Sequence, residues 1–448
     1  MAKVAMLTVV AMSARGPLHA QELPGVSDEV RARLREHQTA AVDWLVEQLV
    51  PNEAVPDPNP ARRNLIVSYR IPPDDPVYPY LYGRSFVYDG AVAAIAFTMS
   101  GRYREAQRAL LALSRQVRGD GSIWFGLNTQ NAWPSEDDSD GAVIRSGASA
   151  WVGYAATFYL RARRAADSDF DVDGNAERRI RTLAVLVADH LIGLQIDDPS
   201  DRRHGLVTGG SGTYTFSADD SDAIVAAFDP AAVEWASTEH NIDAYFLFRD
   251  LAALTGETRY ARAADLVRTG LLSLWSESEG QLYQGVKVDG RVDTVLPLDT
   301  ASWGSLFLGS AGEPVLSDRA IATAQERFQL GDTDHYRPYA DEPVFESPEV
   351  VRAIFGDADT RWNDVEIAWI EGSQGVASAL VQAGLYREAV DTMLAALDHE
   401  VDGGFRYASV EIPELFSRYP SVASTGWFVI ATELLLDETD RGLFWGAR

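Results

Sequence analysis

The sequence predicts an all-α protein whose helices pair into six hairpins and close into an (α/α)6 toroid, with short β-hairpins or loops inserted at the mouth. Twelve helical segments can be read along the 448 residues, and fully apolar helices alternate with amphipathic ones. This alternation is expected when apolar helices form an inner ring and amphipathic helices cover it with their polar faces toward water. An open helical solenoid is the competing architecture, but the strongly apolar alternate helices favour closure.

The first predicted helix spans 27–50, with Ser27 as its N-cap and apolar residues near a spacing of 3.6. Pro51 ends it, and 64–69 is expected to form a short strand. The other helices are predicted at 88–101, 102–117, 145–166, 175–195, 298–312, 314–328, 367–383 and 421–437, together with one inside 234–256 and two that follow Gly256 and Gly384.

A short motif recurs where an apolar helix ends and an amphipathic helix begins. Gly101, Gly256 and Gly384 each stop an apolar helix, and each is followed within four residues by a Tyr and then by an Ala-rich amphipathic helix. The repeated unit is therefore a helical hairpin. A similar loop follows the second helix of each copy, at 120–125, 279–283 and 402–407.

Composition limits the kinds of partner that the protein can bind. The net charge of −27 disfavours binding to nucleic acid or to anionic lipid, since both attract Lys and Arg. Eleven Trp, 17 Tyr and 17 Phe, several of them in loops beside Gly, Asn and Asp, suit the flat faces of sugars. The expected partner is a carbohydrate substrate, and no cofactor is required. The absence of Cys excludes disulfides, thiol nucleophiles and Cys-ligated zinc.

The first 20 residues resemble a short export signal. Lys3 precedes an apolar run from Val4 to Met12, and small residues end the segment at Ala20, although Arg15 lies inside it. We therefore expect an exported protein with one domain over 21–448; a disordered N-terminal tail is the alternative. No apolar run reaches the roughly 18 to 20 residues that a membrane span needs.

The first turns of the six apolar helices should line one mouth of the ring, and four of them carry a carboxylate. These are Asp89, Glu239, Asp299 and Glu371. Ordinary capping would explain Asp89 and Asp299, since acids favour first turns. Capping does not explain Glu239 and Glu371, which lie inside apolar helices where a buried charge is costly unless it is used or paired.

Two carboxylates on either side of a sugar are the machinery of glycoside hydrolysis. In an inverting enzyme one donates a proton to the leaving oxygen and the other, about 6.5–9.5 Å away, activates water. Glu239 is the expected general acid because its apolar helix should raise its pKa. Asp89 or Glu371 is the expected base, and Asp299 holds a substrate hydroxyl or the water. Asp243, one turn after Glu239, is expected to orient Glu239 or His240.

Aromatic, amide and cationic side chains at these helix starts and in the preceding loops are expected to bind the sugar. They are Tyr88, Trp124, Asn128, Trp133, Arg145, His240, Asn241, Trp303, Trp369 and Trp427. The group around Trp124 and Trp133 has an alternative role as a lid that packs into the barrel. The Gly-rich segment 205–222 lacks the ending of a phosphate-binding loop and is expected to form a flap over the substrate.

Three segments resemble a known family. Residues 369–380, W-I-E-G-S-Q-G-V-A-S-A-L, resemble the W-x-E-G-x-x-x-x-A-x-A segment of bacterial six-hairpin glycosidase-like proteins. Residues 423–428 resemble the start of their last inner helix, and 238–243 are similar to a further segment. The resemblance implies an (α/α)6 barrel and carbohydrate chemistry, with glycoside hydrolysis as the expected reaction. Here the last helix ends in Leu436-Asp437 rather than in Asn-Pro-Phe, so no particular substrate is implied.

Two other functions on the same fold stay open from the sequence. A polysaccharide lyase would use a Tyr or His base and a partner for an acidic sugar, which Tyr88, Arg145, His240 and Asn241 could supply. A noncatalytic glycan-binding protein is the other alternative, since fold alone does not establish activity.

A calcium-binding loop is predicted between the fourth and fifth helices. Asp169, Asp171 and Asp173 fall at positions 1, 3 and 5 of a D-x-D-x-D-G motif, and Glu177 falls at position 9. Position 12 is Ile180, so the bidentate Glu is missing. Bound calcium would be structural, and a solvated acidic turn is the alternative. His204, His240 and His335 are too scattered for a zinc signature.

Overall fold

The computed structural model describes residues 26–132, 142–166, 174–218, 223–413 and 415–446. The twelve predicted helices are all present, with ends that differ from prediction by a few residues. Three shorter helices, α2, α11 and α15, were not predicted. The bounds are α1 (Asp28–Glu47), α2 (Tyr78–Leu81), α3 (Val87–Met99), α4 (Tyr103–Ser114), α5 (Ser146–Ala165), α6 (Gly174–Gly193), α7 (Thr238–Thr255), α8 (Thr258–Leu272), α9 (Leu298–Ser310), α10 (Pro314–Phe328), α11 (Pro348–Phe355), α12 (Ile370–Gln382), α13 (Tyr386–Ala396), α14 (Val422–Leu436) and α15 (Glu438–Leu443).

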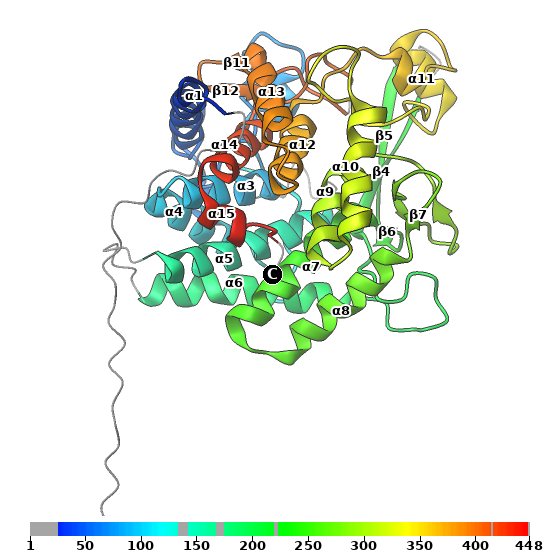
Figure 1. Cartoon of the computed structure of the whole chain (residues 1–448). Helices are drawn as coiled ribbons and strands as arrows, with labels where there is room; N and C mark the ends of the chain where they lie inside the picture. Colours follow the sequence, from blue (N-terminus) through cyan, green and yellow to red (C-terminus); the bar gives the residue numbers. More distant parts are fainter. Residues whose placement is uncertain (1–25, 133–141, 167–173, 219–222, 414, 447–448) are drawn as a thin grey trace, which may run out of the picture.

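Six apolar helices form a closed inner ring (Figure 1). In chain order, α3, α5, α7, α9, α12 and α14 each pack against the next, and α14 packs against α3 to close the circle. The predicted (α/α)6 toroid is confirmed, and the open solenoid is wrong. Closure follows from the sequence, since these helices are buried all round and an open array would leave both terminal helices exposed.

The outer helices pack on the ring as predicted by the alternation. Helices α4, α6, α8, α10 and α13 each follow and contact an inner helix, and α1 contacts α14 to complete the sixth hairpin. Arg35 on α1 forms an ion pair of 3.1 Å with Glu433 on α14, and Gln38 also donates a hydrogen bond to Glu433. The two ends of the chain thus build one hairpin.

Left-handed glycines follow three of the six inner helices, as the repeated motif predicts. Gly101, Gly256 and Gly384 have φ values of 71°, 75° and 77°, which only Gly adopts without strain. Of the outer helices that follow, α4 buries one stripe, formed by Ala106, Ala109, Leu110 and Leu113. The hairpin unit is therefore set by local sequence.

Short antiparallel strands gather around the starts of the inner helices. The sheets are β1–β2, β3–β4–β5, β6–β9–β10, β7–β8 and β11–β12–β13. Their strands are β1 (Arg84–Phe86), β2 (Gly126–Asn128), β3 (Ile144–Arg145), β4 (Gly210–Ala218), β5 (Ile224–Val233), β6 (Ala236–Ser237), β7 (Trp275–Ser276), β8 (Gln281–Leu282), β9 (Gly285–Val286), β10 (Val292–Asp293), β11 (Glu400–Val401), β12 (Gly404–Arg406) and β13 (Pro420–Ser421). The strand predicted at 64–69 is wrong, because this segment makes only isolated bridges, from Ile66 to Leu49 and from Tyr69 to Ser421.

The C-terminal segment fills the end of the barrel opposite these strands. After α15, Trp445 is buried and stacks on Phe246 of α7, with ring centroids 4.6 Å apart. Its ring also contacts Trp151, Trp303 and Trp427 from three other inner helices. The centre of the ring is therefore an aromatic core and not an open channel.

Several predictions fall on residues outside those that the structure describes. They are the export segment 1–20, Trp133, and the calcium-loop residues Asp169, Asp171 and Asp173. No helix in the described ranges has both the length and the apolar character of a membrane span.

Candidate active site

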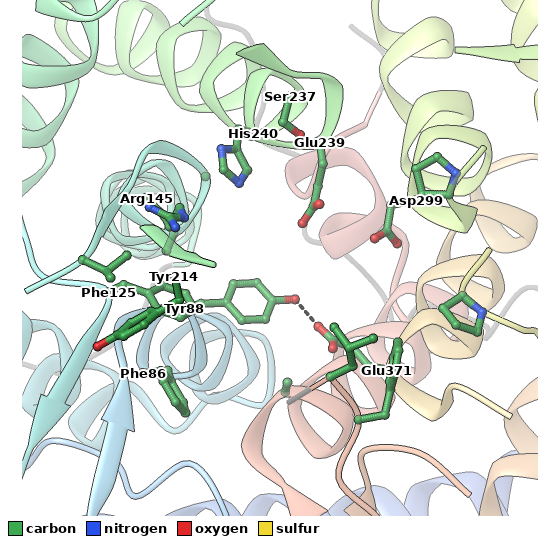
Figure 2. Close-up of a pocket in the computed structure, with 18 of the residues that line it drawn as sticks. Phe86, Tyr88, Phe125, Arg145, Tyr214, Ser237, Glu239, His240, Asp299 and Glu371 are labelled. Carbon is green, nitrogen blue, oxygen red and sulfur yellow. Dashed lines mark hydrogen bonds between the residues drawn. The ribbon is translucent and has the colours of Figure 1, made fainter. Parts of the chain in front are cut away.

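A cavity of 1780 Å³ opens at the strand-lined end of the ring. All six inner helices contribute side chains to it: Asp89 from α3, Trp151 from α5, Glu239 and Asp243 from α7, Asp299 from α9, Glu371 from α12 and Ala423 from α14. Figure 2 shows Glu239 and Glu371 reaching into this space from opposite sides, with Asp299 beside them. The four carboxylates that are far apart in sequence thus line one site.

The acids are not helix caps. The N-caps of α3, α7, α9 and α12 are Phe86, Ser237, Pro297 and Trp369, and none of them makes a side-chain capping hydrogen bond. Asp89 and Asp299 lie inside the first turn, one to two residues beyond the helix start. Capping as the explanation for these two acids is therefore wrong.

Burial raises the pKa of five carboxyl groups in the site. Removal from water raises the pKa of Asp89 and of Glu239 to about 7, and that of Glu371 to about 8. The pKa values of Asp243 and Asp299 lie well above the ordinary range, first because of burial and then because of the negative charge of Glu239. Near neutral pH the site therefore holds several protons.

Glu371 is fixed by a phenol. The hydroxyl of Tyr88 donates to Glu371 Oε1 and accepts a hydrogen bond of 2.8 Å from Trp427 Nε1. Tyr88 and, more weakly, Tyr407 lower the pKa of Glu371 against the effect of burial. Trp427 lies beneath the site without lining the cavity. Its predicted contact with substrate is therefore wrong, and it acts through Tyr88.

Asp299 and Asp243 each have one oxygen that no described group satisfies. Oδ1 of each is buried without a hydrogen-bond partner among the described residues. Nε1 of Trp303, one turn after Asp299, is buried and unpartnered too, and it faces Gly375 of α12. Buried polar atoms are normally paired, so these three mark an unusually polar layer beneath the cavity.

His240 is held as a neutral imidazole at the side of the cavity. Its Nδ1 lies 3.0 Å from Ser146 Oγ, and its ring packs on Trp235 with centroids 5.4 Å apart. Burial, followed by the charge of Arg145, lowers the pKa of His240 to about 3. Gly147 makes room for the ring, because a Cβ there would lie 2.4 Å from His240 Cδ2.

Arg145 lines the cavity, but its guanidinium group donates hydrogen bonds to the backbone. Its Nη1 donates to the carbonyl oxygens of Ile144 at 3.2 Å and Ser211 at 3.3 Å, and also to that of Gly212. These contacts fix the base of the β4–β5 hairpin. Arg145 is therefore a positioning residue for this hairpin.

Three further predicted sugar contacts do not line the cavity. Asn241 is fully buried and binds the backbone of Val207 with both ends of its amide. Asn128 is buried in β2, where its side chain accepts from Gln130 N. Trp124 packs near the guanidinium of Arg118. These three residues stabilise the loops around the site. The sequence pattern did not distinguish such residues from those that line the site.

Several cavity residues were not predicted. Trp151, Tyr407, Tyr339 and Trp235 line the site, and so does Tyr214, which lies in the predicted flap 205–222. A signal for Tyr407 was present, since it ends the third copy of the repeated loop, and Phe125 at the end of the first copy also lines the cavity. Within the described residues no three acidic or histidine side chains are arranged to hold a metal ion.

Comparison with known proteins supports the architecture. No family model and no curated protein matches the chain. A wild-type glycosidase structure matches 92% of this chain and 99% of its own, at 11% identity and a TM-score of 0.58. D-mannose isomerase matches 90% and 97%, at 10% identity and a TM-score of 0.57.

A sugar epimerase from a ruminal bacterium is equally similar. It matches 90% of this chain and 98% of its own, at 8% identity and a TM-score of 0.59. A further glycosidase structure was solved in complex with glucose. Sequence identities this low show that the fold is shared, but they do not show that the reaction is shared. The chain has an (α/α)6 toroid, a fold that it shares with glycosidases, a sugar isomerase and a sugar epimerase.

Proposed function

We propose that the protein is a glycoside hydrolase that cleaves an oligosaccharide or polysaccharide by acid and base catalysis. The observation that carries this proposal is the placement of Glu239 and Glu371 on opposite sides of one cavity, in different hydrogen-bonding environments (Figure 2). Paired carboxyl groups across a sugar are what glycosidic bond cleavage requires.

Glu239 is the proposed general acid. No side chain of the described residues hydrogen-bonds to its carboxyl group, and burial alone raises its pKa to about 7. A group with this pKa is partly protonated near neutral pH, and its proton is free to move to the glycosidic oxygen. Glu239 is only partly buried, so a ligand in the cavity can reach it.

Glu371 is the proposed general base. The hydrogen bond from Tyr88 fixes its orientation and, against the larger effect of burial, lowers its pKa, which stands at about 8, so part of the population is ionised near neutral pH. From its side of the cavity the carboxylate would take a proton from water as the water attacks the anomeric carbon. We expect inversion at that carbon, the outcome when the attacking water lies between the base and the sugar. Asp299 would hold a substrate hydroxyl.

The charge of the cavity favours an uncharged sugar. Among the described residues, nine acids and two cations, Arg145 and Lys287, line it. Arg145 is engaged with backbone carbonyls, and Lys287 lies within 3.7 Å of Asp293. A uronate chain would meet mainly like charge, which disfavours the polysaccharide lyase reaction.

Isomerisation or epimerisation of a free sugar is a second candidate, because proteins with these activities share the fold. Two features favour hydrolysis. The cavity of 1780 Å³ exceeds the roughly 300–1,000 Å³ of an ordinary small-molecule site. His240, the one imidazole among the described residues that line the cavity, has a pKa of about 3 and is a weak base.

The test is a screen of neutral α- and β-linked glucans, mannans and xylans for new reducing ends, with free aldoses and uronate polymers in parallel. We expect the wild type to hydrolyse a neutral glycan, and Glu239→Gln and Glu371→Gln each to lose about 10³-fold or more in kcat. Glu326→Gln, on the exposed side of α10, is the matched control and should retain wild-type activity. Equal activity in all four proteins, or conversion of free aldoses alone, would reject the proposal.

A second measurement tests inversion. Proton NMR of the first product distinguishes its anomeric form before mutarotation, and retention would show that Glu239 and Glu371 act as a closer, nucleophilic pair.

A further inference from the structure

We propose that the β4–β5 hairpin roofs one side of the cavity, so that the protein binds the end of a glycan chain and not an internal segment. This inference rests on the proposed hydrolase function. An enzyme that cuts within a polymer needs a groove that is open at both sides, whereas a covered pocket admits only a chain end.

The hairpin crosses from one side of the mouth to another. It leaves the ring between α6 and α7, where β3 pairs with β4 through Ile144 and Ser211. Strand β4 then packs against α11, which belongs to the insertion between α10 and α12. Figure 1 shows the two long strands running up to α11 beside the ring. The hairpin therefore spans the mouth on the side of α9.

One face of the hairpin lines the cavity. Tyr214 and Phe216 of β4, and Ile224 and Ala226 of β5, line the cavity, while Thr215 and Ser217 are exposed. This alternation is the ordinary two-residue period of a strand. An apolar and aromatic inner face suits contact with a sugar ring, so the hairpin forms a wall of the binding site.

The base of the hairpin is rigid. Gly210 has a φ of 110°, and a Cβ there would lie 2.3 Å from the carbonyl oxygen of Ile144. Gly212 also has a left-handed φ, of 74°, and its carbonyl accepts a hydrogen bond from Arg145. Because Arg145 immediately precedes α5, the hairpin is tied to the inner ring.

A second contact lies on the same side of the mouth. Lys287, in the turn between β9 and β10, lies 3.8 Å from Glu346 just before α11. Both residues line the cavity. The cavity is nevertheless larger than a site for one sugar, so several units of a chain end fit within it.

The first experiment uses the wild-type protein and the hexasaccharide that it hydrolyses among maltohexaose, cellohexaose, mannohexaose and xylohexaose. We expect release of short products from one end from the first turnover, and a loss of about tenfold or more in rate when that end is chemically blocked. On the parent polymer, reducing ends should appear with little fall in viscosity. A random ladder of products with a rapid fall in viscosity would overturn the inference while leaving hydrolysis intact.

The second experiment removes the roof. Replacing residues 213–230 by a Gly-Ser link should raise the rate on the polymer relative to the hexasaccharide by about tenfold and produce internal cuts. Phe216→Ala should raise KM for the hexasaccharide, and the outward-facing Thr215→Ala is its control. If the variant without residues 213–230 folds but keeps the wild-type ratio of polymer to hexasaccharide rates and the wild-type products, the proposal is contradicted. If that variant does not fold, the products of the wild-type protein decide between binding of chain ends and internal cutting. Absence of all hydrolysis would reject the hydrolase function instead.

Discussion

The hydroxyl of Tyr88 on α3 donates a hydrogen bond to Oε1 of Glu371 on α12, across the mouth of the ring. The same hydroxyl accepts from Trp427 Nε1 at 2.8 Å, so its own proton is directed at Glu371. Three inner helices are joined by this chain of groups, which orients the proposed base.

Tyr88→Phe should weaken catalysis through Glu371. The lost hydrogen bond stabilised the carboxylate, so the pKa of Glu371, already about 8, rises further. We expect kcat to fall about tenfold, because the form with Glu371 ionised and Glu239 protonated becomes rarer, and the basic limb of the pH–rate profile, which the higher pKa of the pair sets, to move to higher pH. Tyr386→Phe on the outer helix α13 is the control. A fall in kcat with an unmoved profile would indicate loss of packing alone.

Activity should peak in a narrow window near neutral pH. With pKa values of about 7 for Glu239 and about 8 for Glu371, the pair holds a single proton mainly between these values. More of that proton lies on Glu371, so the productive form, with the proton on Glu239, is the less populated of the two. We expect a bell-shaped dependence of kcat/KM on pH with its maximum between about 7 and 8. Steady-state kinetics from pH 5 to 9 checks this, and a flat profile would count against acid and base catalysis by this pair.

Neutralising a site carboxyl should stabilise the fold at alkaline pH. A raised folded-state pKa means that the folded protein holds a proton that the unfolded chain has released, so stability falls as pH rises from about 4 through the folded pKa. Glu239→Gln should therefore raise the free energy of unfolding by about 1–3 kcal/mol at pH 8 and change it little at pH 4. Urea unfolding at the two pH values measures the difference. Equal effects at both would show that the pKa is not raised.

Gly147→Ala should disturb the site without removing any functional group. The added methyl would lie 2.4 Å from His240 Cδ2, so the imidazole must leave Ser146. We expect kcat/KM to fall by about tenfold or more with the fold retained. Gly193→Ala in α6 is the matched control, because no atom lies within 4 Å of its added Cβ. Wild-type kinetics in Gly147→Ala would show that the position of His240 is unimportant.

Trp445→Ala should destabilise the whole ring. The ring of Trp445 packs against aromatic residues of four inner helices, α5, α7, α9 and α14. Loss of a buried Trp of this kind costs about 3–5 kcal/mol. Thermal and urea unfolding measure the loss. An unchanged free energy of unfolding would mean that the C-terminal segment is not part of the cooperative core.

The sequence by itself determined the ring. Apolar helices that alternate with amphipathic ones can bury their surfaces only in two layers, and the glycines at 101, 256 and 384 mark where one layer turns into the other. The same pattern located the four carboxylates, because the first turns of inner helices share one mouth. These features are local, so spacing and composition suffice to read them.

Tertiary structure alone decided which neighbouring residues serve the site. Asn241 and His240 are adjacent in α7, yet Asn241 binds the backbone of Val207 while His240 reaches the cavity. Arg145 turned out to hold a hairpin, and Trp427 to hold Tyr88. The roof formed by β4–β5 and α11 joins segments more than 100 residues apart. Such contacts depend on where distant chain segments meet in space, which no local pattern of residues records.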